Sequence, residues 1–164
     1  MKELLPKDQV DIFKTKAAAI AHPHELIVDL LRAIQLSHGW VPDDGVLLTA
    51  ETLGVLPIEV EEVVTFYDKI FRRQVGKRVI HVCDSICCWL TGAEMVTEHL
   101  KKSLGINLGE TTADGHFTLL PTCCLGACGD APAMMIGLTT HGFLTAEKID
   151  DILQKERAAI AAGE

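Results

Sequence analysis

The chain has 164 residues, of which 48% are hydrophobic, so it can form one or two small domains with an apolar core. Its formal net charge of −8 argues against binding to nucleic acid or to an anionic membrane surface, because both need a basic face. No apolar run approaches the ~20 residues that cross a bilayer, and the first residues resemble neither a signal peptide nor a transit peptide. We therefore expect a cytoplasmic chain, in which clustered cysteines are metal ligands or redox thiols more often than disulfides.

The first half of the chain predicts a small helical bundle. Apolar residues recur there with helical period, and proline, aspartate and glycine mark the ends of the periodic segments. The expected helices cover residues 7–21, a segment from Pro23 to Gln35, a segment from Asp43 or Asp44 to Gly54, and a segment that starts at Pro57 and places Tyr67 on its buried face.

The composition changes around residues 72–77, where we place a boundary between domains 1–75 and 76–164 and expect Arg72 to lie in a solvated hinge. The second half predicts the order β-α-β-β-β-α. The expected strands are 78–82, 116–120, 133–136 and 141–144; one helix begins with a capping box of Thr91 and Glu94, another is capped by Thr145, and the tail from Ala158 is expected to fray.

The order of these elements brings two distant loops together. A β-α-β unit has a right-handed crossover, and if its two strands are parallel, the loops that follow them lie at the same end of the sheet. All six cysteines lie in the loops that follow the first two strands, at positions 83, 87, 88, 123, 124 and 128. The sequence therefore predicts one four-thiolate site made from both loops.

The spacing leaves the ligand set open, because Cys83 can pair with Cys87 or Cys88, and Cys128 with Cys123 or Cys124. Four thiolates suit zinc or an iron–sulfur cluster. Zinc ribbons usually have shorter spacings, and the small residues of both loops favour a backbone that wraps around a [2Fe–2S] cluster. Neither loop has the C-x-x-C motif of a thiol–disulfide enzyme, and inert core cysteines would lie in apolar runs.

Three segments carry a resemblance to the thioredoxin-like [2Fe–2S] ferredoxins, and within them to the E subunit of bacterial NADH:quinone oxidoreductase, respiratory complex I. They are CDSICC at 83–88, LLPTCCLGAC at 119–128 and APAMMI at 131–136, with GWVP at 39–42 and TFY at 65–67 in the helical half. The resemblance implies an α+β fold: an N-terminal helical bundle, serving as a docking domain, and a thioredoxin-like domain.

The resemblance also implies the ligands, with Cys83 and Cys88 on one iron and Cys124 and Cys128 on the other. Cys87 and Cys123 are then non-ligands beside the cluster. Cys87 stands where the family commonly has another residue, so it is a spare thiol that could compete as a ligand if Cys88 were removed.

The implied function is electron transfer, with enzyme activity only as part of the complex. The cluster would accept one electron from FMN in a neighbouring flavoprotein subunit that binds NADH, and a large iron–sulfur subunit is a further expected partner. The chain itself has no G-x-G-x-x-G motif and no P-loop. The implied location is the peripheral arm, on the cytoplasmic side of the bacterial inner membrane, without membrane insertion. Alternatives are the equivalent subunit of an NAD-linked hydrogenase or formate dehydrogenase, a zinc-stabilised interaction module and a thiol–disulfide enzyme.

Overall fold

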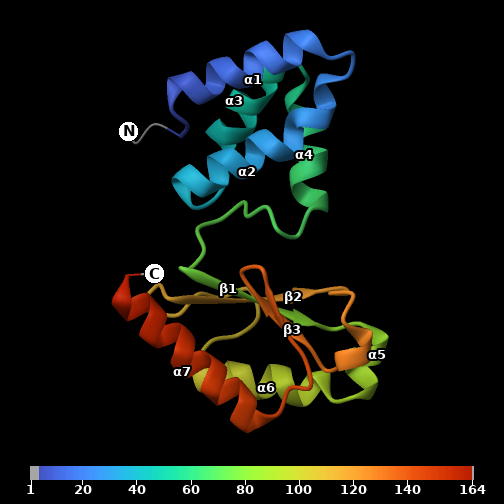
Figure 1. The fold of residues 1–164 in the computed structure, drawn as a ribbon, viewed down its shortest axis with the longest axis vertical. Helices are drawn as coiled ribbons and strands as arrows, with labels where there is room; N and C mark the ends of the chain where they lie inside the picture. The colour runs from blue at the N-terminus through green and yellow to red at the C-terminus, as the bar shows by residue number, and fades with distance from the viewer. Residues whose placement is uncertain (1–3, 164) are drawn as a thin grey trace. The chain divides into compact units, whose positions relative to one another are not determined.

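The computed structural model describes residues 4–163, which form two compact units (Figure 1). The first unit ends at Gln74 and contains only helices, and the second begins at Val75 and contains the sheet. In residues 4–163 no helix combines the length and the apolar character that crossing a membrane requires.

The helical unit has the four helices that the sequence predicts. A short 3₁₀ turn precedes the second helix. Pro23 opens this 3₁₀ turn instead of the α-helix, and Pro42, not an aspartate, is the N-cap of the third helix. The elements are α1 Lys7–Ala19, η1 Pro23–Leu26, α2 Ile27–His38, α3 Asp43–Leu53 and α4 Pro57–Phe66.

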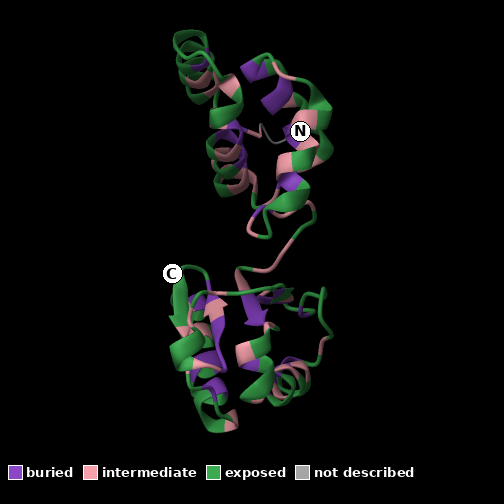
Figure 2. Cartoon of the chain, turned by 90° about the vertical axis from the view of Figure 1, so that its right-hand side faces the viewer, coloured by how far each residue is buried: buried purple, intermediate pink, exposed green. Residues whose placement is uncertain are grey.

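The core of the helical unit consists of the apolar stripes of these helices, which Figure 2 shows as buried segments on the inner sides of the bundle. Completely or almost completely buried are Ile27, Leu30, Leu31, Ile34, Val41 and Val60. The prediction for Tyr67 was wrong, because α4 ends at Phe66 and the Tyr67 side chain is 44% exposed.

The segment that leaves the helical unit is held to it by two side chains. The Gln35 amide donates to the carbonyl of Lys69 and accepts from the N–H of Phe71. The Arg72 guanidinium donates to the carbonyl of Val41 at 2.6 Å and forms ion pairs with the carboxylates at positions 43 and 61. The expectation of a solvated Arg72 was therefore wrong, because these acceptors draw its guanidinium onto the bundle.

The second unit is a four-stranded sheet with two long helices on one face (Figure 1). The strand order is β2-β1-β3-β4; β1 and β2 are parallel, whereas β3 runs antiparallel to both of its neighbours. This is the α+β, thioredoxin-like architecture predicted from the sequence. The elements are β1 Arg78–Cys83, α5 Ile86–Leu90, α6 Ala93–Leu104, β2 Phe117–Thr122, η2 Cys128–Asp130, β3 Met134–Ile136, β4 Thr139–His141 and α7 Ala146–Ala162.

Alternate strand residues point towards α6 and α7 and form one apolar core. Residues 80 and 82 of β1 share this face with their paired residues in β2 and β3. The core includes Ile80, Val82, Phe117, Leu119, Met134, Leu100, Val96, Ile149 and Leu153.

Several local predictions in this unit need correction, and the first is the fourth strand, which is Thr139–His141 and not 141–144. Thr91 does not cap α6, whose N-cap is Gly92; its hydroxyl instead donates to the carbonyls of Cys87 and Cys88 at the end of α5. The short helix α5 was not predicted. The tail does not fray, because α7 continues to Ala162 and buries Ile160, although Thr145 caps it as expected.

A tight turn precedes β2. The Asp114 carboxylate accepts hydrogen bonds from the Thr112 hydroxyl and from the N–H of His116. Both bonds favour the charged carboxylate, so they lower the pKa of Asp114, the Thr112 bond most strongly. The turn therefore starts the second strand with an ionised side chain.

Candidate metal centre

Parallel pairing of β1 with β2 places both cysteine loops at one edge of the sheet. The last residue of β1, Cys83, is paired with Thr122, the last residue of β2. The next residue continues this contact, since the N–H of Asp84 donates to the carbonyl of Thr122 at 3.1 Å. The two loops therefore start side by side, as the strand order predicts.

The first loop contributes a buried pair of thiols. Cys83 ends β1 and Cys88 lies on α5, and each is only 2% exposed. Burial raises the pKa of the Cys88 thiol, and its hydrogen bond with the Cys83 thiol raises it further. The first loop therefore places two buried thiols near each other at the end of β1.

The second loop contributes an exposed pair. The sulfur atoms of Cys124 and Cys128 lie 3.9 Å apart, and both residues are exposed. Gly126 has φ +73°, a conformation that glycine adopts without strain, and this turns its N–H towards the sulfur of Cys124 at 3.4 Å. Backbone N–H groups aimed at sulfur are the outer contacts that an iron–sulfur cluster uses.

The end of the second loop is fixed by the segment that follows β4. The N–H of Phe143 donates to the carbonyl of Asp130, and the N–H of Leu144 donates to the carbonyl of Pro132 at 3.2 Å. Gly142 lies directly against Asp130, so that a β-carbon built on it would be 2.4 Å from the Asp130 β-carbon. These hydrogen bonds and the close approach of Gly142 therefore fix the far end of the loop that carries the exposed pair.

The two pairs face each other. A negative charge on Cys124 would raise the pKa of Cys88, which places the exposed pair close to the buried one. Among residues 4–163, no group of three or more His, Cys, Asp or Glu side chains converges as it would around a single ion. Two pairs of thiolates suit a binuclear [2Fe–2S] centre, and four thiolates also suit a zinc ion.

The four proposed ligands form a buried pair, Cys83 with Cys88, and an exposed pair, Cys124 with Cys128, and the other two cysteines differ from each other in position. Cys123 contributes its carbonyl, which accepts a hydrogen bond from the Cys83 thiol at 3.3 Å, while its own side chain is exposed.

Cys87 belongs to the group of interacting thiols, unlike Cys123. Its hydrogen bond to the Cys128 thiol is the largest cause that raises the pKa of Cys128 to about 11. Sequence reasoning placed both Cys87 and Cys123 outside the ligand set and singled out Cys87 only as a spare thiol. The equal spacing of Cys83 with Cys87 and of Cys124 with Cys128 was the only available signal that Cys87 also faces the site.

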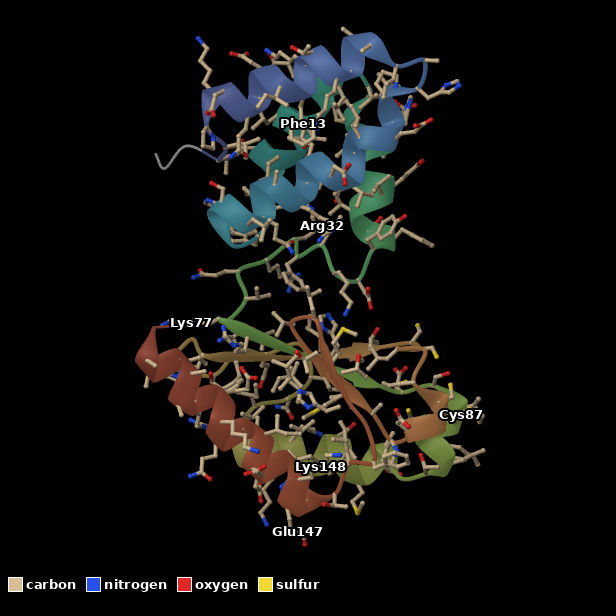
Figure 3. All side chains as sticks on the ribbon, in the orientation of Figure 1. Phe13, Arg32, Lys77, Cys87, Glu147 and Lys148 are labelled. Atoms are coloured by element: carbon tan, nitrogen blue, oxygen red, sulfur yellow. The ribbon has the colours of Figure 1, made fainter. Side chains whose placement is uncertain are left out.

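An apolar surface lies beside the thiols. Ile86, Trp89 and Leu90 of α5 are 61%, 60% and 71% exposed, and Met95 at the start of α6 is 60% exposed. The Trp89 side chain therefore points outward. Figure 3 shows α5, marked by the labelled Cys87, at the outer end of the unit.

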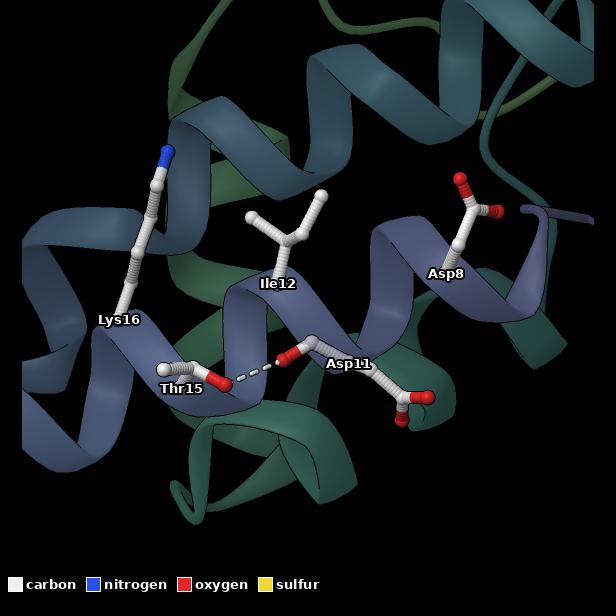
Figure 4. Close-up of a pocket in the computed structure, with 5 residues that line it drawn as sticks. All are labelled: Asp8, Asp11, Ile12, Thr15 and Lys16. Atoms are coloured by element: carbon white, nitrogen blue, oxygen red, sulfur yellow. Dashed lines mark hydrogen bonds between the residues drawn. The ribbon is translucent and has the colours of Figure 1, made fainter.

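Two surface cavities of about 330 Å³ lie away from the thiols. One runs along α1, where Ile12 lies between polar side chains and the Thr15 hydroxyl bonds to the carbonyl of Asp11 (Figure 4). The other is at the sheet edge beside Lys77 and Glu156. Neither cavity includes a cysteine, so neither extends the candidate metal centre.

Comparisons with known proteins agree with this geometry. The family model of thioredoxin-like [2Fe-2S] ferredoxin matches residues 13–157. The E subunit of NADH-quinone oxidoreductase from Pseudomonas aeruginosa is 42% identical over 158 residues, which covers 92% of this chain and 95% of that protein. The protein of the same name from Escherichia coli K12 is 43% identical over 157 residues, covering 90% of this chain and 95% of that protein.

Among solved structures, an NAD+-reducing [NiFe]-hydrogenase in the air-oxidized state has a similar fold. The TM-score is 0.66 at 25% identity, and the match covers 80% of this chain. It covers only 23% of the hydrogenase chain, so the same fold there is one part of a longer polypeptide.

Proposed function

The chain belongs to the thioredoxin-like [2Fe–2S] ferredoxin family, and on this premise we propose that it is the electron-transferring E subunit of an NADH-quinone oxidoreductase. In this role it accepts one electron from the FMN of a neighbouring flavoprotein subunit, which also binds NADH. The chain is then an enzyme component that is not catalytic alone.

The proposal rests on one observation, which is that the two pairs of thiols face each other. Cys83 and Cys88 would hold one iron, and Cys124 and Cys128 the other. When bound, the cluster supplies a one-electron redox centre. The chain's own residues hold it between two strand ends, shield one pair from water by burial, and direct the Gly126 N–H towards a ligand sulfur.

The unequal burial of the two pairs indicates the side from which a partner exchanges electrons. Cys124 and Cys128 are exposed, whereas Cys83 and Cys88 are buried. The exposed apolar residues of α5 lie in the first cysteine loop, and they offer a surface that the flavoprotein subunit would cover. A large iron–sulfur subunit would contact another face, within the peripheral arm on the cytoplasmic side of the membrane.

A second candidate is the equivalent subunit of an NAD-linked hydrogenase, which the fold match to a hydrogenase favours. The relatives from NADH-quinone oxidoreductases match over almost their whole length at 42–43% identity, against 25% for part of the hydrogenase chain. The first candidate therefore has the stronger support.

Spectroscopy of matched variants tests the ligand set. The purified chain should be red-brown, contain two irons and become EPR-active after one-electron reduction. Cys124→Ser should bleach or shift this spectrum, whereas Cys123→Ser should leave it nearly unchanged. A colourless chain with one zinc ion would contradict the proposal, and a spectrum sensitive to Cys123 but not Cys124 would reassign the ligands.

The partner can be tested separately. NADH should reduce the cluster only when an FMN-containing flavoprotein subunit is present, because the chain has no nucleotide-binding motif. The cluster signal is followed during addition of NADH with the flavoprotein, with apoflavoprotein as the control. Equal reduction by NADH without flavin would contradict the proposed electron donor.

A further inference from the structure

One segment joins the two compact units, and on the helical side it is held as far as Phe71. Ile70 lies in the core of the helical unit and is 6% exposed. The N–H of Val41 donates to the carbonyl of Phe71 at 2.7 Å, and the Gln35 amide oxygen accepts from the N–H of Phe71 at 2.7 Å. These contacts keep the start of the segment on the bundle.

Arg72 is the last residue held on the helical side. Its guanidinium lies 2.6 Å from the Val41 carbonyl, 2.6 Å from the Asp43 carboxylate and 3.3 Å from the Glu61 carboxylate. Only 25% of the Arg72 side chain is exposed, so solvent ions screen these contacts less than they screen a fully exposed pair. Arg72 therefore acts as a latch, which ends the part of the chain that moves with the helical unit.

On the other side, the second unit holds the chain from Gly76 onward. The N–H of Gly76 donates to the Thr118 hydroxyl at 2.7 Å, and the N–H of Arg78 donates to the carbonyl of His116 at 2.8 Å. A β-carbon on Gly76 would lie 2.9 Å from backbone atoms of His116 and Phe117, so the chain passes directly against the start of β2. Gly76 is therefore fastened to the sheet.

Between these two ends, residues 73–75 have no comparable restraint. No hydrogen bond or ion pair joins them to any part of residues 4–163. Arg73 and Gln74 are exposed, Val75 is half-buried, and none of the three is a proline, whose ring would fix a backbone angle. Each of them keeps two soft backbone dihedral angles, which neither unit sets.

We propose that residues 73–75 are a hinge, with the Arg72 latch and Gly76 as its two fixed ends. Three extended residues span roughly 10 Å. The hinge therefore limits the distance between its ends and leaves the direction of the chain open. A tether this short also holds one unit at a high effective concentration near a partner that the other unit has bound. The hinge thus begins after Arg72, which the sequence predicted to lie within it.

Residual dipolar couplings of the full chain test the hinge by nuclear magnetic resonance. In a weakly aligned sample, two bodies that reorient separately need two different alignment tensors, whereas one rigid body needs a single tensor. We expect the couplings of the helical unit and of the second unit to require two tensors. A single tensor that fits both units would overturn the proposal.

Two matched triple variants change the stiffness of the hinge and leave Arg72 and Gly76 in place. Arg73→Pro/Gln74→Pro/Val75→Pro converts the segment into a stiff polyproline helix, so the two tensors should converge to one. Arg73→Gly/Gln74→Gly/Val75→Gly is the control and should keep two tensors. Two unchanged tensors in the proline variant, or one tensor in the glycine variant, would overturn the proposal.

The latch is tested by removing one arginine at a time. Arg72→Ala should lower the amide order parameter of residue 72 from about 0.85, the value of a rigid backbone, to below about 0.6. Arg73→Ala removes the neighbouring arginine, which forms no ion pair within residues 4–163, and should leave residue 72 rigid. Equal order parameters of residue 72 in the two variants would overturn the role of Arg72. A residue 72 that is already mobile in the unmodified chain would overturn it without any variant.

Discussion

Replacing Gly142 with alanine should destabilise the loop that carries the exposed thiol pair. The new β-carbon would lie 2.4 Å from the Asp130 β-carbon and 2.6 Å from the Asp130 carbonyl oxygen. Carbon atoms pack at about 3.5–4.0 Å, so one of the two segments must move by roughly 1 Å. Overpacking of this kind costs about 1–3 kcal/mol, and disturbing the hydrogen bond from Phe143 to Asp130 adds about 0.5–1.5 kcal/mol. We expect a total loss of about 2–4 kcal/mol.

Urea unfolding of the cluster-free chain measures this loss. A Trp40→Phe background leaves Trp89 as the only tryptophan, so that its fluorescence follows the α/β unit. With an m-value of about 1–2 kcal/mol/M, the midpoint for Gly142→Ala should fall by roughly 1–4 M. On heating, the loaded variant should also release its cluster at a lower temperature.

Gly129→Ala is the matched control, because it lies in the same loop and a β-carbon there meets no heavy atom within 4 Å. Its urea midpoint should stay close to that of the parent chain. Equal midpoints for Gly129→Ala and Gly142→Ala would refute the reasoning, since the close approach of Gly142 to Asp130 would then contribute nothing to stability.

Three further predictions concern the partner surface, the turn before β2 and the second loop. Trp89→Ala should weaken binding to the flavoprotein subunit severalfold in a titration, whereas Leu36→Ala, which removes an 86% exposed side chain of α2, should not; equal effects would contradict the proposed surface. The lowered pKa of Asp114 means that its stabilising effect is complete above its ordinary pKa of 3.8 and is lost as the pH falls through the lower folded value. Asp114→Asn should therefore lower the urea midpoint at pH 7 and reduce the difference between the urea midpoints at pH 7 and pH 2. An unchanged difference between these two midpoints would contradict the prediction. Gly126→Ala, at φ +73°, should cost about 1 kcal/mol and speed cluster loss, which visible absorbance follows; an unchanged rate would show that this conformation is not needed.

The sequence predicted the features of the fold that depend on periodicity and strand order. Apolar spacing located the helices of the bundle, and the β-α-β order correctly placed the two cysteine loops at one edge of the sheet. These features are repeated over many residues, so one ambiguous position does not change the result.

The predictions that failed depend on single side chains. Thr91 and Glu94 have the spacing of a capping box, but α5 ends at Leu90, so the Thr91 hydroxyl bonds to the carbonyls of that helix instead. Helical spacing placed Tyr67 on a buried face, yet α4 ends at Phe66 and the Tyr67 side chain is 44% exposed. Tertiary contacts decided both cases, and no local pattern contains them.

The candidate site was likewise predicted in part. Spacing identified two cysteine pairs and left the ligands open, and the resemblance selected Cys83, Cys88, Cys124 and Cys128. The resemblance marked Cys87 alone as a spare thiol, but neither the spacing nor the resemblance predicted a contact between Cys87 and Cys128. Only the orientation of α5 shows that Cys87 reaches Cys128.

The parallel pairing of β1 with β2 also sets the order of events during folding. Arg78 pairs with Phe117 and Cys83 with Thr122, so the pairing is non-local and must close a long loop, which makes it slow to form. While the chain is being synthesised, the first pair of thiols emerges long before the second, and neither alone offers four ligands. The two pairs of thiols therefore come together only when the sheet has formed, so the candidate site depends on the completed fold.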